Sequence, residues 1–389
     1  MTAYDAIVVG LGAMGSAATY QLSRRGLRVL GLDAFEAGHE LGSSHGESRI
    51  IRLAYYEHPG YVPLLRRAYE LWAELEQESA SPLLSLTGGL MIGPPDGELV
   101  SGTRASAEQH GLSVEVLDAV EVRHRFPALQ PADDEVALFE PQAGFLRPER
   151  CIEVALRLAS AAGALIHHGE PVRAWRATPR TIELSTDLGT YTAERLVLTC
   201  GARMSSVLDP ASVPVVAERM PLFWMQPDQP RLFSVERLPV YLWEVSRDAM
   251  FYGFPHVEWP GVKVARHHSG DFCDPDTVDR HVNETDEARL RAVIQNRLPN
   301  LNGEVVSSRV CLYENSPDHH FLIDCLPEHP NVVFAGGFSG HGFKFASVVG
   351  EILADLVTGR RAMPEADFLR AARLGPQSGG GFTHPMGSG

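Results

Sequence analysis

Near the N-terminus the chain reads AIVVGLGAMG over residues 6–15, an apolar run that leads directly into three glycines. The β-branched residues of the run predict a buried strand, and the small residues that follow predict a helix that ends at Gly26. A second apolar strand is predicted over residues 27–32 and ends at Asp33. A glycine pattern between a strand and a helix is typical of proteins that bind an adenine dinucleotide. The alternative is a glycine-rich turn in an unrelated α/β fold.

Each residue of this pattern has its own physical role. Gly10 permits the tight turn, Gly12 lets the backbone approach a pyrophosphate, and Gly15 lets the helix pack closely on the strand. The phosphates would lie at the helix N-terminus, where free N–H groups and the helix dipole favour anions. Asp33 follows Gly15 by 18 residues and is placed to accept a hydrogen bond from a ribose hydroxyl. The pattern alone leaves NAD and FAD open.

Apolar periodicity predicts the remaining elements. Helices are expected over 61–77, 151–162, 286–298 and 345–356, and strands over 88–93, 195–200, 222–225, 240–245, 250–254 and 331–337. The strands that end in glycine near residues 200 and 336 are expected to return to the first domain, whereas the aromatic-rich strands between residues 205 and 300 predict a separate antiparallel sheet.

We therefore predict a two-domain α/β (α+β) fold. A Rossmann-like domain is expected from three pieces of the chain, and a substrate domain with an antiparallel sheet from two more. The predicted ranges are 1–80, 145–205 and 305–370 for the first domain, 81–144 and 206–304 for the second, and 374–389 for a disordered tail. A plain NAD dehydrogenase usually has a continuous nucleotide domain, so this layout favours FAD.

Composition and charge restrict the function further. The net charge is 34 − 49 = −15, which argues against nucleic acid or an anionic membrane as a partner. No apolar run is long enough to span a bilayer, and the N-terminus does not resemble a signal peptide. Five scattered cysteines do not form a disulfide pattern, so we expect a cytoplasmic protein.

Lysine is almost absent from this chain. Of its 34 basic residues, Lys263 and Lys344 are the only lysines. Arginine can replace lysine on a solvated surface, but not where a compact ammonium is needed. Both lysines are therefore candidate functional residues, although chance survival at two neutral positions is the alternative.

Four stretches together resemble the D-amino-acid-oxidase-like family of FAD enzymes, and within it the monomeric sarcosine oxidase and N-methyltryptophan oxidase group. They are the fingerprint that ends at Asp33, GSSHGESRIIR over 42–52, CLYENSPD over 311–318 and GFSGHGFKF over 337–345. The resemblance covers roughly residues 4–360. Arg203 departs from it, because the family often has tryptophan there, and the loops between residues 205 and 250 match poorly.

The resemblance implies roles for individual residues. Cys311 matches the cysteine that forms a thioether with the flavin 8α-methyl carbon, and Lys263 matches the lysine that activates O₂. Arg52 and Lys344 match the pair that holds the substrate carboxylate.

Tyr252 and His267 match groups that line the substrate cavity, with no general-base role assigned. The expected cofactor contacts are Gly10, Gly12, Gly15, Asp33, Ser43, His45, Arg49, Val172, Cys311, Gly340, His341, Gly342 and Lys344. Neither His267-His268 nor His319-His320 predicts a metal site, because adjacent side chains on a strand point to opposite faces.

The activity implied is oxidation of the C–N bond of a small N-methyl amino acid, such as sarcosine or N-methyltryptophan. O₂ would be the electron acceptor, H₂O₂ a product, and the imine would hydrolyse to formaldehyde and the demethylated amino acid. The substrate would need a free carboxylate, and the enzyme would be a monomer. Three alternatives remain: an oxidase of a cyclic secondary amino acid such as pipecolate, a nicotinamide dehydrogenase, and a catalytically silent flavin-binding subunit.

Overall fold

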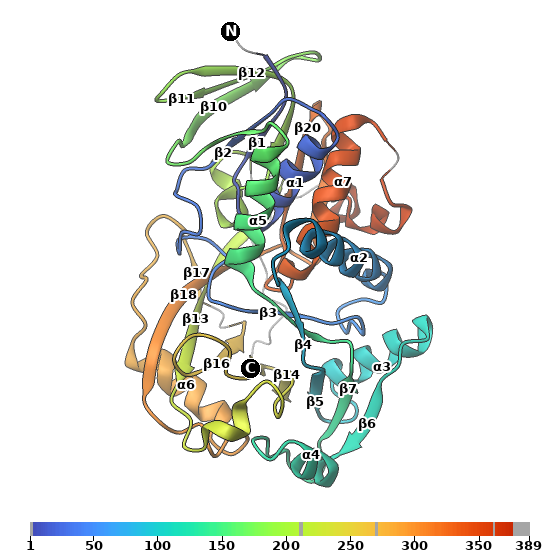
Figure 1. Cartoon of the computed structure of the whole chain (residues 1–389), viewed down its shortest axis with the longest axis vertical. Coiled ribbons are helices and arrows are strands. Elements are labelled where there is room, and N and C mark those ends of the chain that lie inside the picture. Colours follow the sequence, from blue (N-terminus) through green and yellow to red (C-terminus); the bar gives the residue numbers. More distant parts are fainter. Residues whose placement is uncertain (1–2, 210–212, 269–270, 361, 376–389) are drawn as a thin grey trace.

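The computed structural model of the protein describes residues 3–209, 213–268, 271–360 and 362–375. Its two large sheets lie in different halves of the molecule, and the chain passes between the halves several times (Figure 1). Strands and helices from the beginning, middle and end of the chain gather in the upper half of the view.

The first sheet has a parallel core in the order β20-β12-β1-β2-β9. Strands β10 and β11 extend it antiparallel beside β12, and β19 pairs antiparallel with β20. Its strands are β1 (Ala3–Val9), β2 (Val29–Leu32), β9 (Leu165–His167), β10 (Val172–Ala177), β11 (Ile182–Thr186), β12 (Thr190–Leu198), β19 (Leu322–Leu326) and β20 (His329–Gly336). This parallel core confirms the predicted Rossmann-like class.

The turn from β1 into helix α1 (Ala13–Arg24) depends on two glycines. Gly10 has φ +85°, and a Cβ atom there would lie 2.5 Å from the carbonyl oxygen of Thr199. A Cβ atom on Gly15 would lie 1.7 Å from the carbonyl oxygen of Gly10. Larger residues cannot fit at either position without moving the backbone, so the close helix–strand packing predicted from the sequence is present.

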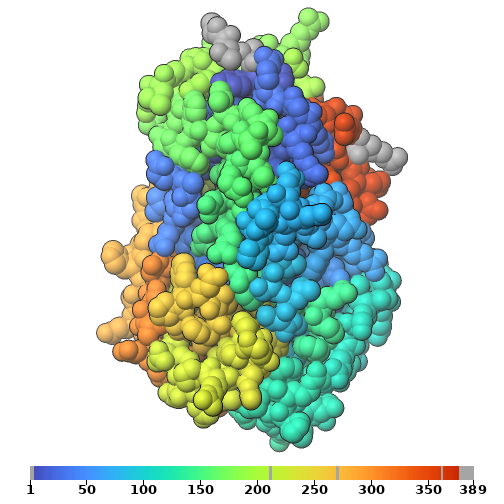
Figure 2. All heavy atoms as spheres, in the orientation of Figure 1, coloured from blue at the N-terminus to red at the C-terminus, as the bar shows by residue number. Residues whose placement is uncertain are grey.

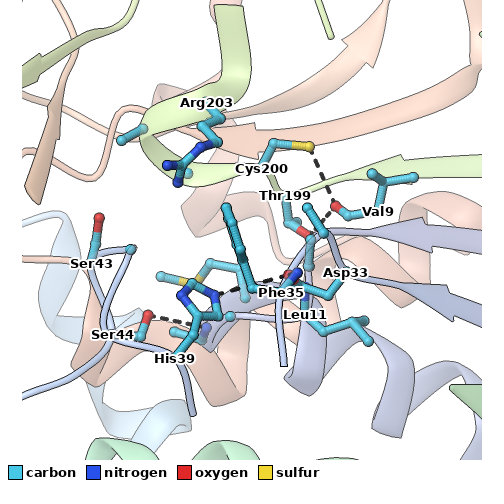
Figure 3. A pocket seen from close by; sticks show the side chains of 18 of the residues that line it. Val9, Leu11, Asp33, Phe35, His39, Ser43, Ser44, Thr199, Cys200 and Arg203 are labelled. Atoms are coloured by element: carbon cyan, nitrogen blue, oxygen red, sulfur yellow. Dashed lines mark hydrogen bonds and ion pairs between the residues drawn. The ribbon is translucent and has the colours of Figure 1, made fainter. Parts of the chain in front are cut away.

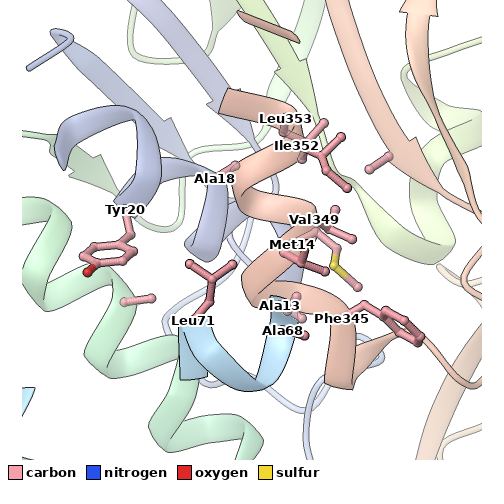
Figure 4. Packing of buried hydrophobic residues seen from close by; sticks show 14 of the residues in the cluster. Ala13, Met14, Ala18, Tyr20, Ala68, Leu71, Phe345, Val349, Ile352 and Leu353 are labelled. Atoms are coloured by element: carbon pink, nitrogen blue, oxygen red, sulfur yellow. The ribbon is translucent and has the colours of Figure 1, made fainter. Parts of the chain in front are cut away.

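Helix α1 packs against helices α7 (Ala346–Thr358) and α2 (Tyr61–Ser79) in the main hydrophobic core. Figure 4 shows Met14 and Ala18 of α1 close to Val349 and Ile352 of α7. Helix α5 (Pro148–Ala161) packs against α1 from another side. The packing of α7 and α5 against α1 therefore fixes the position of the glycine turn from which α1 starts.

The second sheet has nine strands. Their order is β17-β13-β16-β15-β14-β5-β7-β6, and β18 pairs with β13. The strands are β5 (Gly89–Gly93), β6 (Glu115–Asp118), β7 (Val136–Glu140), β13 (Val216–Met225), β14 (Val240–Ser246), β15 (Ala249–Gly253), β16 (Val262–His267), β17 (Phe272–Cys273) and β18 (Val305–Asn315). The pairing of β14 with β5 is parallel, so the sheet is mixed rather than wholly antiparallel as expected.

Strand β18 differs from the predicted division of the chain. We placed residues 305–370 in the first domain, yet β18 pairs antiparallel with β13 from Val305 to Asn315. A strand with this many backbone hydrogen bonds belongs physically to the sheet it pairs with, and the chain returns to the first sheet only at β19.

A small third sheet links the two halves, with β3 (Arg49–Ile51) and β4 (Leu84–Leu86) on either side of β8 (Gly144–Leu146). Helices α3 (Glu98–His110), α4 (Ala119–Arg125) and α6 (Glu284–Ile294) complete the lower half.

Two of the predicted helices, and the predicted strand–helix junction near residue 200, differ from the structure for local reasons. Helix α5 begins at Pro148 because proline suits the first helical position. Helix α6 begins at Glu284, after a capping box formed by Asn283, and ends at Ile294 rather than 298. The strand that ends near residue 200 leads into a 3₁₀ turn, η1 (Gly201–Ser206), and not into an α-helix.

The C-terminal region and the surface complete the description. Helix α7 follows a 3₁₀ turn, η3 (Phe343–Phe345), and a further 3₁₀ turn, η5, covers Ala371–Leu374. Residues 376–389 of the predicted tail lie outside the described residues. Within the described part of the chain, no helix has both the length and the apolar character that crossing a membrane requires. Figure 2 shows the N-terminal segment and the segment near residue 350 together in the upper half.

Candidate active site

A cavity of about 470 Å³ lies where β1, β2 and β12 end, at the carboxyl edge of the parallel sheet (Figure 3). Ligands of open α/β sheets bind at this edge. Eight of the thirteen residues expected to contact the cofactor line it, namely Gly10, Gly12, Asp33, Ser43, Arg49, Val172, Gly340 and Gly342. Gly15 lies behind the turn and acts through packing.

Asp33 holds the turn in its present form. Its carboxylate is buried and accepts hydrogen bonds from the backbone N–H groups of Leu11, at 2.6 Å, and Phe35, at 2.9 Å. Asp33 also lines the cavity. The predicted ribose contact is therefore compatible with its position.

Buried polar atoms that lack a hydrogen-bond partner show whether the site is suited to a dinucleotide. Among the described residues, Ser43 Oγ and both ring nitrogens of His45 are buried without a hydrogen-bond partner. Burial, followed by the charge of Arg49, lowers the pKa of His45 to about 3, so its ring is neutral and has one donor and one acceptor. Buried polar groups normally have partners, and Ser43 lines the cavity, so its hydroxyl fits a polar ligand such as FAD. His45 does not line the cavity.

Cys311 lies on β18 at the point where the two halves meet. Its buried Sγ atom accepts from the guanidinium of Arg49 at 3.5 Å and lies 3.5 Å from the carbonyl oxygen of Ser43. Three residues predicted separately as cofactor contacts are therefore neighbours, although they come from opposite ends of the chain.

Lys263 lies on β16 and is almost completely buried. Its Nζ atom donates to the carbonyl oxygens of Gly46, at 2.5 Å, and Ser48, at 2.7 Å, and it lies 4.7 Å from the centre of the Phe254 ring. Burial, followed by the nearby charge of Arg49, lowers the pKa of Lys263 well below its usual value. Carbonyl oxygens can only accept hydrogen bonds, so this environment suits a donor with several N–H bonds.

Arg52 and Lys344 meet at the ring of Tyr55. The guanidinium carbon of Arg52 lies 4.3 Å from the ring centre and the Nζ atom of Lys344 lies 5.1 Å from it. Lys344 donates to the Tyr55 hydroxyl at 3.2 Å and to the carbonyl oxygen of His341 at 2.6 Å. The structure thus brings together the two cations that were expected to act as a pair.

The sequence did not indicate the partner of Arg52. Its Nη2 atom donates to both carboxylate oxygens of Glu57, at 2.8 and 3.0 Å. Glu57 comes from the loop that leads into α2, and it belongs to no motif that would have identified it. Arg52 is therefore already paired with a carboxylate in this structure.

Tyr252 and His267 lie together on neighbouring strands. Their ring centres are 6.3 Å apart, and His267 Nδ1 is 3.1 Å from the hydroxyl of Tyr313. Burial, and then the neighbouring His268, lowers the pKa of His267 well below its usual value. Burial raises the pKa of Tyr252 to about 12, against the opposing effect of Arg49. Both side chains are neutral hydrogen-bonding groups at neutral pH.

His341 is tied to the pair of cations rather than to the cavity. Its Nδ1 atom is 2.7 Å from the Tyr55 hydroxyl and its Nε2 atom is 2.9 Å from the carbonyl oxygen of His319. Burial, followed by Lys344, lowers its pKa well below the usual value.

Arg203, which departs from the family pattern, lies at the cavity. Figure 3 shows it extending toward Phe35, and its guanidinium carbon is 4.8 Å from the centre of that ring. It also donates to the Asp276 carboxylate at 2.6 Å. In the described part of the chain, no group of three or more metal-ligating side chains is present.

Comparison with known proteins first identifies the class. The chain matches the family described as FAD dependent oxidoreductase over residues 5–356, and it belongs to this family. The family match confirms FAD as the cofactor and leaves the nicotinamide alternative without support.

Individual relatives then narrow the group. A monomeric sarcosine oxidase of Streptomyces avermitilis is 45% identical, over 93% of this chain and 95% of that protein. An N-methyl-L-tryptophan oxidase of Salmonella agona is 36% identical, over 95% of this chain and 99% of that protein. The solved structure of NikD, described as an unusual amino acid oxidase, has a TM-score of 0.85 and 26% identity, with 99% of this chain and 100% of that chain covered. The resemblance found in the sequence is confirmed.

Proposed function

We propose that this FAD-dependent oxidoreductase oxidises the C–N bond of a small N-methyl amino acid such as sarcosine or N-methyltryptophan. O₂ is the acceptor and H₂O₂ is released, and the imine hydrolyses to formaldehyde and the demethylated amino acid. The names of the relatives at 45% and 36% identity support this substrate class. The name of the first relative also supports a monomer.

The pairing of two buried cations on the Tyr55 ring carries the proposal. Burial, followed by the charge of Arg52, lowers the pKa of Lys344 to about 7, and the opposing effect of Glu57 is smaller. The ammonium form of Lys344 is therefore destabilised in the absence of a further anion. A substrate carboxylate supplies that anion. Lys344 binds it as a point charge, and Arg52 binds it through its planar guanidinium after the hydrogen bonds between Arg52 and Glu57 are broken. Such a clamp fixes the orientation of the substrate.

Lys263 acts on the oxygen side of the reaction. Bound FAD supplies two-electron oxidation of the carbon next to the amine nitrogen, and O₂ then takes up the electrons. Lys263 provides a fixed N–H donor in a site from which water is excluded, and such a donor stabilises negative charge that develops on oxygen. Arginine is bulkier and differently hydrated, which explains why lysine is retained here.

Cys311 would hold the flavin through a thioether to the 8α-methyl carbon. This bond would form with loss of the thiol proton and one methyl C–H, and the two electrons removed would pass to O₂, which leaves as H₂O₂. The Sγ atom of Cys311 lies beside the Arg49 guanidinium and the carbonyl oxygen of Ser43, and both of these residues line the cavity. A cation next to the sulfur stabilises negative charge during attack on an electrophilic carbon.

Two measurements test these assignments. Acid precipitation of the purified protein should leave the yellow colour in the pellet, and Cys311→Ala should release it to the supernatant. Peroxide release should be measured with sarcosine, N-methyl-L-tryptophan and pipecolate, and with dimethylamine as a matched control that lacks the carboxylate. We expect turnover with an N-methyl amino acid and none with dimethylamine. A yellow protein that oxidises none of these amines would support the silent-subunit alternative, and turnover of pipecolate alone would support the cyclic one.

A further inference from the structure

The carboxyl group of Glu314 has no role in the functions described so far, although it reaches the cofactor cavity. It lies near the end of β18, three residues after Cys311, and is 6% exposed. Glu314 lines the cavity together with Tyr313 and Gly201. Its Oε2 atom lies close to β20, 3.8 Å from the position that a Cβ atom on Gly336 would take.

The two oxygens of this carboxyl group are in different situations. Backbone N–H groups of Phe338 and Gly337 donate to the carboxyl group. The Oε2 atom is buried and has no hydrogen-bond partner in the described structure. An unpartnered buried carboxylate oxygen is costly, whereas a protonated oxygen becomes a donor that an acceptor in the cavity can satisfy.

We propose that Glu314 binds the dinucleotide as a neutral acid and donates its O–H to an acceptor oxygen of FAD. This inference rests on FAD binding and not on the choice of substrate. It adds a cofactor contact that neither the glycine pattern nor the resemblance indicated.

The charges around Glu314 support the neutral form. Burial is the main influence and raises its pKa to about 8, while the two backbone N–H groups act weakly in the other direction. The elements packed on it present Ala217 from β13, Gly336 from β20 and Met204 from η1, which do not ionise. Cys200 is the titratable neighbour, and burial raises its pKa to about 12.

The remaining charged groups face the same cavity from other elements. They are Asp33, Glu36, Arg49, Glu170, Arg173, Arg203 and Asp276, and His39 and His168 line it as well. Arg203 is paired with Asp276, and Arg49 donates to Cys311 and to backbone carbonyls. No cation in the described structure forms an ion pair with Glu314, so no positive charge offsets the effect of burial on its pKa.

A pH dependence of cofactor binding follows. FAD carries a negatively charged diphosphate, so ionised Glu314 both loses its donor and repels the ligand. Affinity should be level below about pH 8 and then fall by about tenfold per pH unit, because binding takes up one proton.

The test uses the full chain with Cys311→Ala, in which cofactor binding is reversible. FAD affinity is measured by flavin fluorescence between pH 6 and pH 9.5. We expect the decline above pH 8 in this parent, a level profile with Glu314→Gln added, and affinity about tenfold weaker below pH 8 with Glu314→Ala. Parallel titrations with ADP and with riboflavin 5′-phosphate identify the half of FAD that carries the acceptor.

Glu140→Gln is a matched control. Glu140 is also buried with a raised pKa and also accepts from two backbone N–H groups, those of Leu53 and Ala54, but it does not line the cavity. Its variant should keep the decline of the parent. The same decline in Glu314→Gln, or unchanged affinity in Glu314→Ala, would overturn the proposal.

A second measurement does not depend on affinity: the infrared spectrum of the holoprotein at pH 7, from which the spectrum of the Glu314→Gln holoprotein is subtracted. The C=O stretch of a protonated carboxylic acid should be present at pH 7 and missing in Glu314→Gln. A spectrum at pH 7 that Glu314→Gln leaves unchanged would overturn the proposal even if the variants bind FAD poorly.

Discussion

The cofactor side and the substrate side of this molecule are built by different means. The cofactor cavity lies at strand ends and turns, in which glycines such as Gly10 allow close approach of the backbone. The substrate side depends on buried charged side chains, and Lys263, for example, is held by the backbone carbonyls of Gly46 and Ser48, which are distant in sequence. A site made by backbone should fail when atoms are added, and a site made by charges should fail when charge is removed.

The largest effect is expected from atoms added at the turn. Gly15→Ala places a Cβ atom 1.7 Å from a carbonyl oxygen and should destabilise the protein by about 3 kcal/mol or more, with loss of flavin. Gly12→Ala is the control for stability alone, because its Cβ atom would meet only Ser44 Oγ at 3.5 Å. Its flavin content should still fall, because Gly12 is where the backbone is expected to approach the pyrophosphate. Urea denaturation and flavin content would measure both. Equal stability of the two variants would contradict the role given to Gly15.

A second large effect is expected on the charged side, at Lys263. Lys263→Met should slow reoxidation of the reduced enzyme by O₂ by roughly a hundredfold, while anaerobic reduction by substrate changes much less. Lys263→Arg should not restore the rate, because the buried site fits a compact ammonium. Stopped-flow absorbance separates the two half-reactions. An equal loss in both would point to a general structural defect.

Lys344 should make substrate binding depend on pH. Its ammonium is the form that binds a carboxylate, and its pKa is lowered to about 7. The dissociation constant of acetate, followed by the flavin spectrum, should therefore rise by up to about tenfold per pH unit above pH 7. Lys344→Met should bind weakly at every pH. A flat profile in the unmodified enzyme would remove Lys344 from the clamp.

The lowered pKa of Lys344 has the opposite effect on folding: the free energy of unfolding should rise with pH, whereas acetate binding should weaken. A lowered pKa means that the unfolded chain binds the proton more tightly, so buried Lys344 costs stability below its unfolded pKa, and the full cost is reached below about pH 7. Lys344→Met should accordingly raise the melting temperature at pH 6, and by a smaller margin at pH 9. A variant that melts lower at both pH values would contradict the lowered pKa.

The smallest effect is expected at Glu57. Glu57→Gln should release Arg52 from its present carboxylate partner and tighten acetate binding by up to about tenfold. Glu70→Gln, on the exposed face of α2, is a suitable control, because Glu70 forms a surface ion pair with Arg67. Weaker acetate binding in Glu57→Gln would show that Glu57 positions Arg52 instead of competing for it.

This contrast also explains what the sequence could predict. The first strand, the glycine turn and Asp33 follow from local pattern, since their roles depend on neighbours in the chain. The resemblance suggested Arg52 and Lys344, and the shortage of lysine drew attention to Lys344 independently. Glu57 stands in no motif, and Glu314 stands in the 311–318 stretch without a role implied by the resemblance. Only the folded chain shows that Glu57 pairs with Arg52 and that Glu314 is buried at the cavity.

The boundary at residue 305 was missed for a related reason. The sequence of β18 predicts a strand, but the choice between two sheets depends on its long-range pairing with β13. The predicted division into domains at this point had no local signal to rely on.

The position of β18 has a mechanical consequence. The strand is hydrogen-bonded into the lower sheet, yet Cys311 in its second half lies beside the carbonyl oxygen of Ser43, in the segment that follows β2. A cofactor joined there would be fastened to one half by a covalent bond and gripped in the other by the glycine turn. The cofactor would thereby connect the two halves. The flavin-bound protein should therefore unfold cooperatively in one step, whereas in the flavin-free protein the two halves should unfold less cooperatively.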